Sequence, residues 1–279
     1  MPDLPNEPQS TLQDIHVVVT RPAHQARGLS DLIEQRGGRV ILFPVLDIAA
    51  KIDDEFLHLV DHLNEYQLAL FISPNAVNLA LPVIKAHGGL PSGLRIGAVG
   101  KATAAALTAQ GCSVDVLPQD RFDSESLLAL PAMQAVRNTK IVIFRGQGGR
   151  ELLADTLRKR GASVHYAECY RRVKPDSDPQ LLLNHWAQHQ LDIIIVTSVE
   201  GLTNLMDLVG GAGRDLLMAT PLLMVSERMV EEARRLGVKS SIVMAAKASD
   251  QDIVDALAQW AQQWHSQRQQ AQFQKQQQQ

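Results

Sequence analysis

The sequence predicts an α/β protein made of two similar, doubly wound parallel-sheet lobes that arose by internal duplication. The first observation is a repeat: Arg21 and Arg145 end similar apolar runs 124 positions apart (145 − 21), and Ser73 and Ser198 follow similar runs 125 positions apart (198 − 73). The second is that short β-branched runs alternate with helical patterns, as in parallel sheets covered on both faces. The length of 279 residues also favours two domains.

In the first half, β-branched and aromatic runs indicate strands, and apolar residues spaced i, i+3, i+4 indicate helices. Leu29, Leu32 and Ile33 show that spacing, and Gly37-Gly38 ends the helix. Gly88-Gly89 and Gly111 are the corresponding stops of two later helices. In chain order we predict a strand at 17–20, helix 25–36, strand 40–45, helix 54–63, strand 68–72, helix 76–87, strand 95–99, helix 102–110, strand 114–117 and helix 124–136.

The second half repeats this alternation by the same criteria. Its strands are short and continuously apolar, as expected for strands buried on both faces. We predict a strand at 141–144, helix 150–160, strand 164–168, helix 179–188, strand 193–196, helix 199–209, strand 222–225, helix 227–236, strand 242–244 and helix 250–264.

Composition excludes several classes of protein. The net charge of −3 and pI of about 6.3, without a Lys/Arg block, argue against nucleic-acid binding. Only Cys112 and Cys169 occur, without metal-ligand spacing, which favours a reduced, cytoplasmic protein. The first residues show no basic region followed by an apolar one, so we expect no signal peptide, and no apolar run approaches the roughly 18 residues of a membrane span. We expect residues 1–13 and the Gln-rich residues 266–279 to be disordered tails.

The carboxyl ends of the predicted strands are followed by small polar residues, glycines and arginines at helix N-termini. Backbone N–H groups and the helix dipole favour anions there, doubly wound sheets bind ligands at these ends, and two lobes predict a ligand cleft. For two of the serines, a plain N-cap is the alternative. The candidates outside the glycine-rich loop are Arg21, Ser73, Lys101, Thr103, Thr197, Ser198 and Ser226.

The loop Arg145–Arg150, which contains Gly146, Gly148 and Gly149, is the most specific local motif. It departs from the dinucleotide fingerprint at Glu151, where G-x-G-x-x-G requires glycine, and no Walker lysine follows. A glycine-rich turn with two flanking arginines suits carboxylates, which arginine can hold with two hydrogen bonds. The alternative is a tight turn with solvated arginines.

Few other residues suggest acid–base or metal chemistry. Tyr170, one of three tyrosines, follows the strand 164–168 and is a candidate proton donor, with packing as the alternative. His58 and His62 share a helical face, but no third ligand is apparent, so we predict no metal. No G-x-S-x-G motif occurs, which argues against a hydrolase triad.

The ordered series of motifs from about residue 14 to residue 264 resembles the uroporphyrinogen-III synthases. The segments that carry this resemblance are Val19-Thr20-Arg21-Pro22, Phe43-Pro44-Val45-Leu46, Phe71-Ile72-Ser73-Pro74-Asn75-Ala76-Val77, Ala98-Val99-Gly100-Lys101-Ala102-Thr103, Arg145-Gly146-Gln147-Gly148-Gly149-Arg150-Glu151 and Val196-Thr197-Ser198. The resemblance implies interleaved lobes: residues 14–46 plus 171–265 form lobe one, and 49–168 form lobe two. Extended connectors would lie near 46–48 and 169–171.

The resemblance also implies the reaction. A lyase without a cofactor would remove water from linear hydroxymethylbilane and cyclise it with inversion of the last pyrrole ring, giving uroporphyrinogen III for tetrapyrrole biosynthesis. Uncatalysed closure gives isomer I. Tyr170 matches the tyrosine thought to help the hydroxyl leave. Residues matching substrate-facing positions are Ser73, Thr103, Arg145, Gly146, Gly148, Gly149, Thr197 and Ser198, and we add Arg21, Lys101, Arg150 and Ser226 as candidates.

Ser226 marks a departure from the family, because some members carry threonine in that loop. The alternative function is a non-catalytic two-lobed binding protein for an anionic small molecule, because a fold alone does not establish function. We expect a monomer that contacts its upstream partner, hydroxymethylbilane synthase, transiently, and that binds neither nucleic acid nor membrane.

Overall fold

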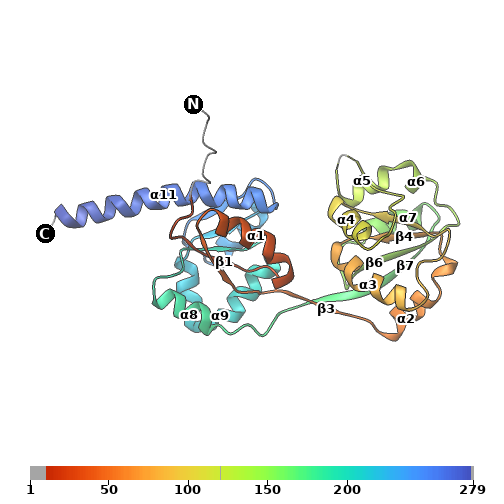
Figure 1. The fold of residues 1–279 in the computed structure, drawn as a ribbon, viewed down its shortest axis with the longest axis horizontal. Helices are drawn as coiled ribbons and strands as arrows, with labels where there is room; N and C mark the ends of the chain where they lie inside the picture. Colours follow the sequence, from red (N-terminus) through yellow and green to blue (C-terminus); the bar gives the residue numbers. More distant parts are fainter. Residues whose placement is uncertain (1–10, 120, 278–279) are drawn as a thin grey trace, which may run out of the picture. The chain divides into compact units, whose positions relative to one another are not determined.

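The structure, a computed structural model, describes residues 11–119 and 121–277. Its tertiary contacts separate two compact units (Figure 1). Unit 1 comprises the described residues up to 47 and from 174 onward, and unit 2 comprises Ile48–Val173. The chain therefore passes between the units twice, at 47/48 and at 173/174.

Unit 1 contains a five-stranded sheet in the order β10-β9-β8-β1-β2. Its neighbouring strands pair in parallel, with Val17 of β1 opposite both Val40 of β2 and Ile193 of β8. The strands are β1 (His16–Val19), β2 (Arg39–Leu42), β8 (Ile193–Ile195), β9 (Leu222–Met224) and β10 (Ile242–Met244).

Helices cover both faces of this sheet because successive side chains of a strand point to opposite sides. Val17 and Val19 pack in a core with α1 (Ala23–Gln35) and α11 (Asp250–Gln277). Val18 packs on the other side, in a core formed with α8 (Gln180–Ala187), α9 (Val199–Ala219) and α10 (Glu227–Arg235). The continuous apolar runs of the sequence therefore reflect burial on both faces.

Unit 2 repeats this architecture with the strand order β3-β7-β6-β4-β5. Its strands are β3 (Asp47–Ala50), β4 (Leu68–Phe71), β5 (Arg95–Ala98), β6 (Lys140–Gly146) and β7 (Ser163–Val173). One face packs on α2 (Asp54–Asp61), the short helix η1 (Leu63–Glu65), α3 (Pro74–Ala86) and α4 (Lys101–Ala109). The other face packs on α5 (Ser124–Ala129), α6 (Pro131–Gln134) and α7 (Leu152–Lys159).

The two sheet orders correspond under the sequence offset. The offset relates β1 to β6, β2 to β7, β8 to β4 and β9 to β5, and the order β9-β8-β1-β2 thereby becomes the observed order β5-β4-β6-β7. A duplication would produce this match, and the duplication itself stays a prediction. In each unit the strand order reverses direction at one place, between β1 and β8 or between β6 and β4. In doubly wound sheets the ligand site lies beyond the carboxyl ends of the strands at such a reversal.

Among the predicted elements that differ from the structure are the strand 114–117 and the helices 124–136 and 199–209. Residues 114–117 make a single bridge, from Val116 to Gly97, because the Asp115 carboxylate accepts the Ile96 N–H that a ladder would use and Pro118 cannot donate. The predicted helix 124–136 is broken into α5 and α6 at Leu130, which is extended ahead of Pro131. Helix α9 continues past the predicted end at 209, with non-helical backbone at Gly210.

The described residues of both predicted tails form a turn or continue a helix, and the predicted disorder of the tails stays a prediction. Leu12 is fully buried, and its N–H donates to the Arg36 carbonyl. Residues 266–277 continue α11, which in Figure 1 extends beyond the other elements of unit 1. Glutamine is a good helix former, and Arg268 lies over the Trp264 ring at 5.2 Å, which supports this extension. Residues 1–10, 278 and 279 lie outside the described part of the chain. None of the helices in the described ranges is long and apolar enough to cross a membrane.

Candidate active site

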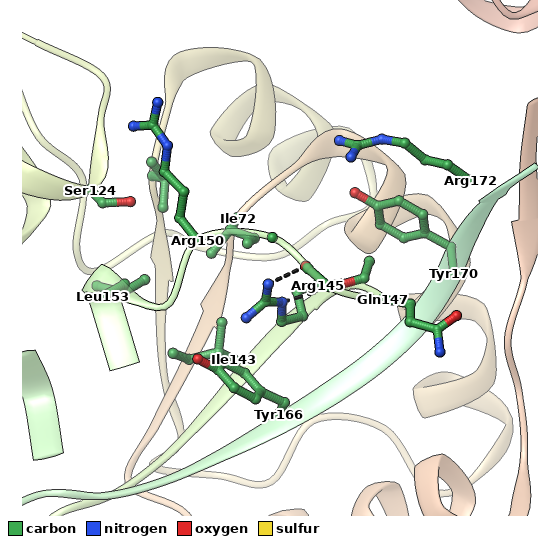
Figure 2. A pocket seen from close by; sticks show the side chains of 14 residues that line it. Ile72, Ser124, Ile143, Arg145, Gln147, Arg150, Leu153, Tyr166, Tyr170 and Arg172 are labelled. Atoms are coloured by element: carbon green, nitrogen blue, oxygen red, sulfur yellow. Dashed lines mark hydrogen bonds between the residues drawn. The ribbon is translucent and has the colours of Figure 1, made fainter. Parts of the chain in front are cut away.

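A cavity of about 240 Å³ opens in unit 2 at the carboxyl ends of β4 and β6, where the sheet order reverses. This is the position at which a doubly wound sheet binds its ligand. Apolar side chains form one part of the lining: Ile72, Val99, Ile143 and Leu153. Ser124 and the loop after β6 contribute polar groups, and the remaining lining side chains are Arg145, Gln147, Arg150, Tyr166, Tyr170 and Arg172 (Figure 2).

Tyr170 reaches this cavity through a register shift between β6 and β7. Arg145 pairs with Glu168, but Gly146 pairs with Tyr170, so Cys169 is an extra residue in β7. A β-carbon on Gly146 would lie 2.5 Å from the Tyr170 ring, so the absence of a side chain at 146 lets the ring lie against the loop. The Gln147 N–H donates to the Tyr170 carbonyl at 2.7 Å and joins the loop to β7.

The Tyr170 hydroxyl, on a residue only 6% exposed, lies 3.0 Å from Ser73 Oγ. Ser73 is the N-cap of α3, and its Oγ accepts the Ala76 N–H at 3.1 Å. One serine therefore both caps α3 and contacts the Tyr170 hydroxyl. Because the cap is fixed by a helix packed on the sheet, the tyrosine hydroxyl has a fixed partner.

Arg145 is turned back into the loop and is 2% exposed. Its Nε donates to the Gly146 carbonyl at 3.2 Å, one Nη contacts Glu151 at 3.1 Å, and the other donates to the Gly148 carbonyl. A buried guanidinium requires partners of this kind. Direct contact of Arg145 with substrate would require these contacts to break.

Glu151 and Tyr166 complete the contacts of Arg145. The Tyr166 hydroxyl donates to Glu151, and the Arg145 guanidinium carbon lies 4.4 Å from the centre of the Tyr166 ring. The hydrogen bond from Tyr166, with smaller contributions from Arg145, lowers the pKa of Glu151 below its ordinary value. Burial, reinforced by the Glu151 carboxylate, raises the pKa of Tyr166. At neutral pH the pair therefore consists of a carboxylate and a phenol.

Arg150 and Arg172 differ from Arg145 in that both are exposed. In the described part of the chain, neither side chain takes part in an ion pair or a hydrogen bond. In Figure 2 their side chains extend away from Arg145, and Arg172 lines the same cavity as Tyr170. The cavity is therefore bordered by two cationic groups that are available to an anionic ligand.

Not all predicted residues of unit 2 come together at this cavity. Lys101, the first residue of α4, lies outside the described lining and sits 4.9 Å from the centre of the Phe122 ring. Thr103 is buried on the core side of α4, at 3% exposure. Seven predicted residues do lie together, namely Ser73, Arg145, Gly146, Gly148, Gly149, Arg150 and Tyr170.

The other predicted residues follow strands of unit 1. Arg21, after β1, pairs with Asp250 at the start of α11. Ser198 caps α9, since its Oγ accepts the Gly201 N–H at 2.9 Å, and half-buried Thr197 precedes it. Exposed Ser226 holds the N-cap position of α10 without a side-chain cap bond.

Sequence reasoning missed Gln147, Tyr166, Arg172 and Ser124 as lining residues. For Arg172 a signal was present, because it is two residues after Tyr170 and residues i and i+2 of a strand share a face. Tyr166 had no comparable signal, because its role depends on Glu151, a residue of another element.

Comparison with known proteins gives consistent results. A sequence model of the family described as "Uroporphyrinogen-III synthase HemD" matches residues 28–255. The chain is 34% identical to uroporphyrinogen-III synthase of Salmonella typhimurium and 32% identical to that of Escherichia coli; each match covers 86% of this chain and 99% of the relative. Its fold is similar to crystal structures of the synthases from Thermus thermophilus (TM-score 0.56, 19% identity, 89% of this chain and 99% of that one) and Helicobacter pylori (TM-score 0.56, 13% identity, 88% and 99%).

Proposed function

The chain belongs to the uroporphyrinogen-III synthase family and functions in tetrapyrrole biosynthesis, and on this premise we propose that the cavity of unit 2 binds the hydroxymethyl end of linear hydroxymethylbilane. Tyr170 would be the residue that assists loss of the hydroxyl group. Elimination of water followed by ring closure would make the enzyme a cyclising lyase. It would act as a monomer on bilane released by hydroxymethylbilane synthase.

The volume and charge of the cavity support binding of one pyrrole ring. At about 240 Å³ the cavity is smaller than the roughly 300–1,000 Å³ of sites that enclose a whole drug-sized ligand. The substrate has four pyrrole rings and eight carboxylates, so each ring carries two. Arg150 and Arg172 are two exposed guanidinium groups that border the cavity, and each can hold one carboxylate.

The hydrogen bond between Ser73 and Tyr170 supports a proton donor at this position. Ser73 Oγ accepts the Ala76 N–H and still has its own hydrogen, which it can donate to the Tyr170 oxygen. The phenol hydrogen is then free for the substrate hydroxyl. In the step that we propose, the pyrrole nitrogen lone pair forms an exocyclic double bond, the C–O bond breaks, and the phenol proton joins the leaving oxygen.

The products of that step are water, an azafulvenium cation and the Tyr170 phenolate, so charge and atoms balance. The Ser73 hydrogen bond would stabilise the phenolate as it forms, which favours the transition state over the ground state. The same phenolate can take back a proton when the ring closes. The remaining work is orientation of a reactive intermediate, which alone contributes several kcal/mol to catalysis.

One observation carries this proposal: the Tyr170 hydroxyl lies 3.0 Å from Ser73 Oγ at the reversal point of the sheet. The test is isomer analysis with hydroxymethylbilane generated in situ, followed by oxidation and chromatography of isomers I and III. Wild type should yield isomer III, and Tyr170→Phe should turn over about 100-fold more slowly while remaining folded. Tyr66→Phe is the matched control, since Tyr66 lies in the same unit and contacts His165 instead.

Wild-type turnover by Tyr170→Phe would remove this residue from the mechanism. Isomer I alone from folded wild-type protein would instead favour the non-catalytic binding protein.

A further inference from the structure

We propose that Arg145, Glu151 and Tyr166 are positioning residues, which hold the loop of residues 146–149 in the shape that aligns Tyr170 with the substrate. This inference rests on the proposed function, because it assumes that Tyr170 assists the reaction. None of the three residues needs to touch the substrate. Their effect on catalysis would pass through the loop to the tyrosine.

Arg145 is bound by the loop that it adjoins. All three nitrogens of its guanidinium contact protein groups: the carbonyls of Gly146 and Gly148, and Glu151. A buried guanidinium without such partners would be strongly unfavourable, so the loop carbonyls and the arginine constrain one another. A β-carbon at Gly149 would lie 2.8 Å from an Arg145 nitrogen, which shows how closely the loop wraps this side chain.

Glu151 and Tyr166 both contact Arg145. Glu151 lies 3.1 Å from the arginine on one side and accepts the Tyr166 hydroxyl on the other. The Tyr166 ring contacts two guanidinium groups, with the guanidinium carbons of Arg145 and Arg158 at 4.4 Å and 5.3 Å from its centre. The cation–π contact with Tyr166 and the charged hydrogen bond with Glu151 therefore hold Arg145 in place.

The loop also contacts Tyr170. Gly146 lies directly against the Tyr170 ring, and the Gln147 N–H donates to the Tyr170 carbonyl at 2.7 Å. A displacement of the loop would therefore move the ring away from Ser73. Misplacement of a reacting group by about 1 Å can reduce a rate roughly 100-fold.

The test compares Tyr166→Phe and Glu151→Gln with wild type. Tyr166→Phe removes the hydrogen bond between these residues, whereas Glu151→Gln removes the carboxylate charge but keeps an amide oxygen that can accept a hydrogen bond from Arg145. Both substitutions preserve side-chain size, and Glu151 is half exposed, so the Glu151→Gln variant should fold. We expect kcat to fall roughly 10- to 100-fold, the fraction of isomer I to rise, and the thermal midpoint to stay near that of wild type. Tyr66→Phe, which removes a hydroxyl elsewhere in unit 2, should match wild type in all three readouts.

The double variant Tyr166→Phe/Glu151→Gln gives a further check, because two residues that act through the same Arg145 side chain should show non-additive losses. Losses that multiply, or losses matched by an equal loss of folded protein, would contradict a positioning role. Tyr170→Phe is measured beside these variants. If it is slow while Tyr166→Phe and Glu151→Gln keep wild-type kcat and isomer ratio, the positioning inference alone fails. If Tyr170→Phe turns over normally, both proposals fail.

Discussion

At the scale of single residues, the site depends on what is absent at Gly146 as much as on what is present at Tyr170. The tyrosine ring occupies the space that a side chain at 146 would fill. The three arginines around the loop also separate into two kinds. Arg145 is buried and neutralised by Glu151, whereas Arg150 and Arg172 are exposed beside the cavity. Burial therefore distinguishes Arg145, which is paired within the protein, from Arg150 and Arg172, which are open to a ligand.

The loop glycines provide a test in which one methyl group is added at two positions. In Gly146→Ala the new β-carbon would meet the Tyr170 ring at 2.5 Å, so the ring must move and we expect kcat to fall roughly 100-fold. In Gly148→Ala the β-carbon meets nothing within 4 Å, but φ is +71°, so the main effect is backbone strain of about 1 kcal/mol. Steady-state kinetics and urea unfolding of both variants should show the larger kinetic loss at 146. Equal kinetic losses would show that the Tyr170 contact is unimportant.

Arg172 provides a second test at this scale. Arg172→Met removes a guanidinium beside the cavity while keeping a long side chain, and its exposed position predicts little effect on stability. Loss of one charged contact to a substrate carboxylate should raise KM about tenfold, with a smaller change in kcat. The neighbouring exposed Arg171, which lies outside the described lining of the cavity, is the control, and Arg171→Met should leave KM unchanged. A KM that responds equally to both variants would indicate a general charge effect.

At the scale of elements, a helix N-cap and a strand irregularity create the site together. Ser73 begins α3 and Tyr170 lies in β7, and the register shift at Cys169 places Tyr170 opposite Gly146. Such irregularities can redirect a side chain beside an active site. Helix α3 is fixed because its apolar face packs on the sheet, so the cap serine is held as firmly as the core.

Removal of the cap therefore predicts two separate effects. Ser73→Ala should cost about 1 kcal/mol of stability, because the Ala76 N–H loses its partner. It should also lower kcat roughly tenfold, equivalent to about 1.4 kcal/mol, because Tyr170 loses its hydrogen-bond partner. Asp53 caps α2 in the same unit through the Phe56 N–H at 3.0 Å. Asp53→Ala should show a loss of stability similar to that of Ser73→Ala, with kcat unchanged. A parallel fall in kcat for both would show that destabilisation of unit 2 is sufficient to explain the effect.

At the scale of the whole molecule, the carboxyl groups of the described residues whose pKa values are lowered lie mostly in unit 2. Hydrogen bonds or ion pairs lower the pKa of Asp53, Glu65, Asp123 and Glu151 in unit 2, and Arg235 lowers that of Glu232 in unit 1. A carboxyl whose pKa is lower in the folded state stabilises the protein above its unfolded pKa, and that contribution is lost as the pH falls through the folded pKa. The unfolded values are near 3.8 and 4.5, so the loss falls below about pH 4.5.

Acid should therefore weaken unit 2 before unit 1, and the aromatic residues allow each unit to be followed separately. All three tyrosines (66, 166 and 170) lie in unit 2, and all three tryptophans (186, 260 and 264) lie in unit 1. As the pH is lowered from 7, we expect the tyrosine near-UV signal to change at a higher pH than tryptophan fluorescence. Glu65→Gln, which removes the ion pair with Lys140, should reduce the separation. Loss of the tryptophan signal first would contradict this assignment of the acid-sensitive groups.

The sequence determined the family, the fold class and most elements, because these depend on local patterns and on an ordered series of motifs. The family and the α/β class are confirmed by the comparisons. Continuous apolar runs and apolar residues spaced i, i+3, i+4 involve only near neighbours in the chain, and this is why the strands β1, β4 and β6 were predictable. The predicted elements were wrong where a side chain took the place of a backbone hydrogen bond, as at Asp115, or where a proline ended a helix, as at Pro131.

Only the tertiary structure decided the neighbourhood of each candidate residue. Ser73 and Tyr170 are 97 positions apart, and their hydrogen bond exists because β4, β6 and β7 are neighbours in one sheet. The sequence showed two arginines flanking a glycine-rich loop, but it did not distinguish the buried one from the exposed one. Burial depends on every segment packed around a residue, whereas a sequence pattern reports only the residues beside it in the chain.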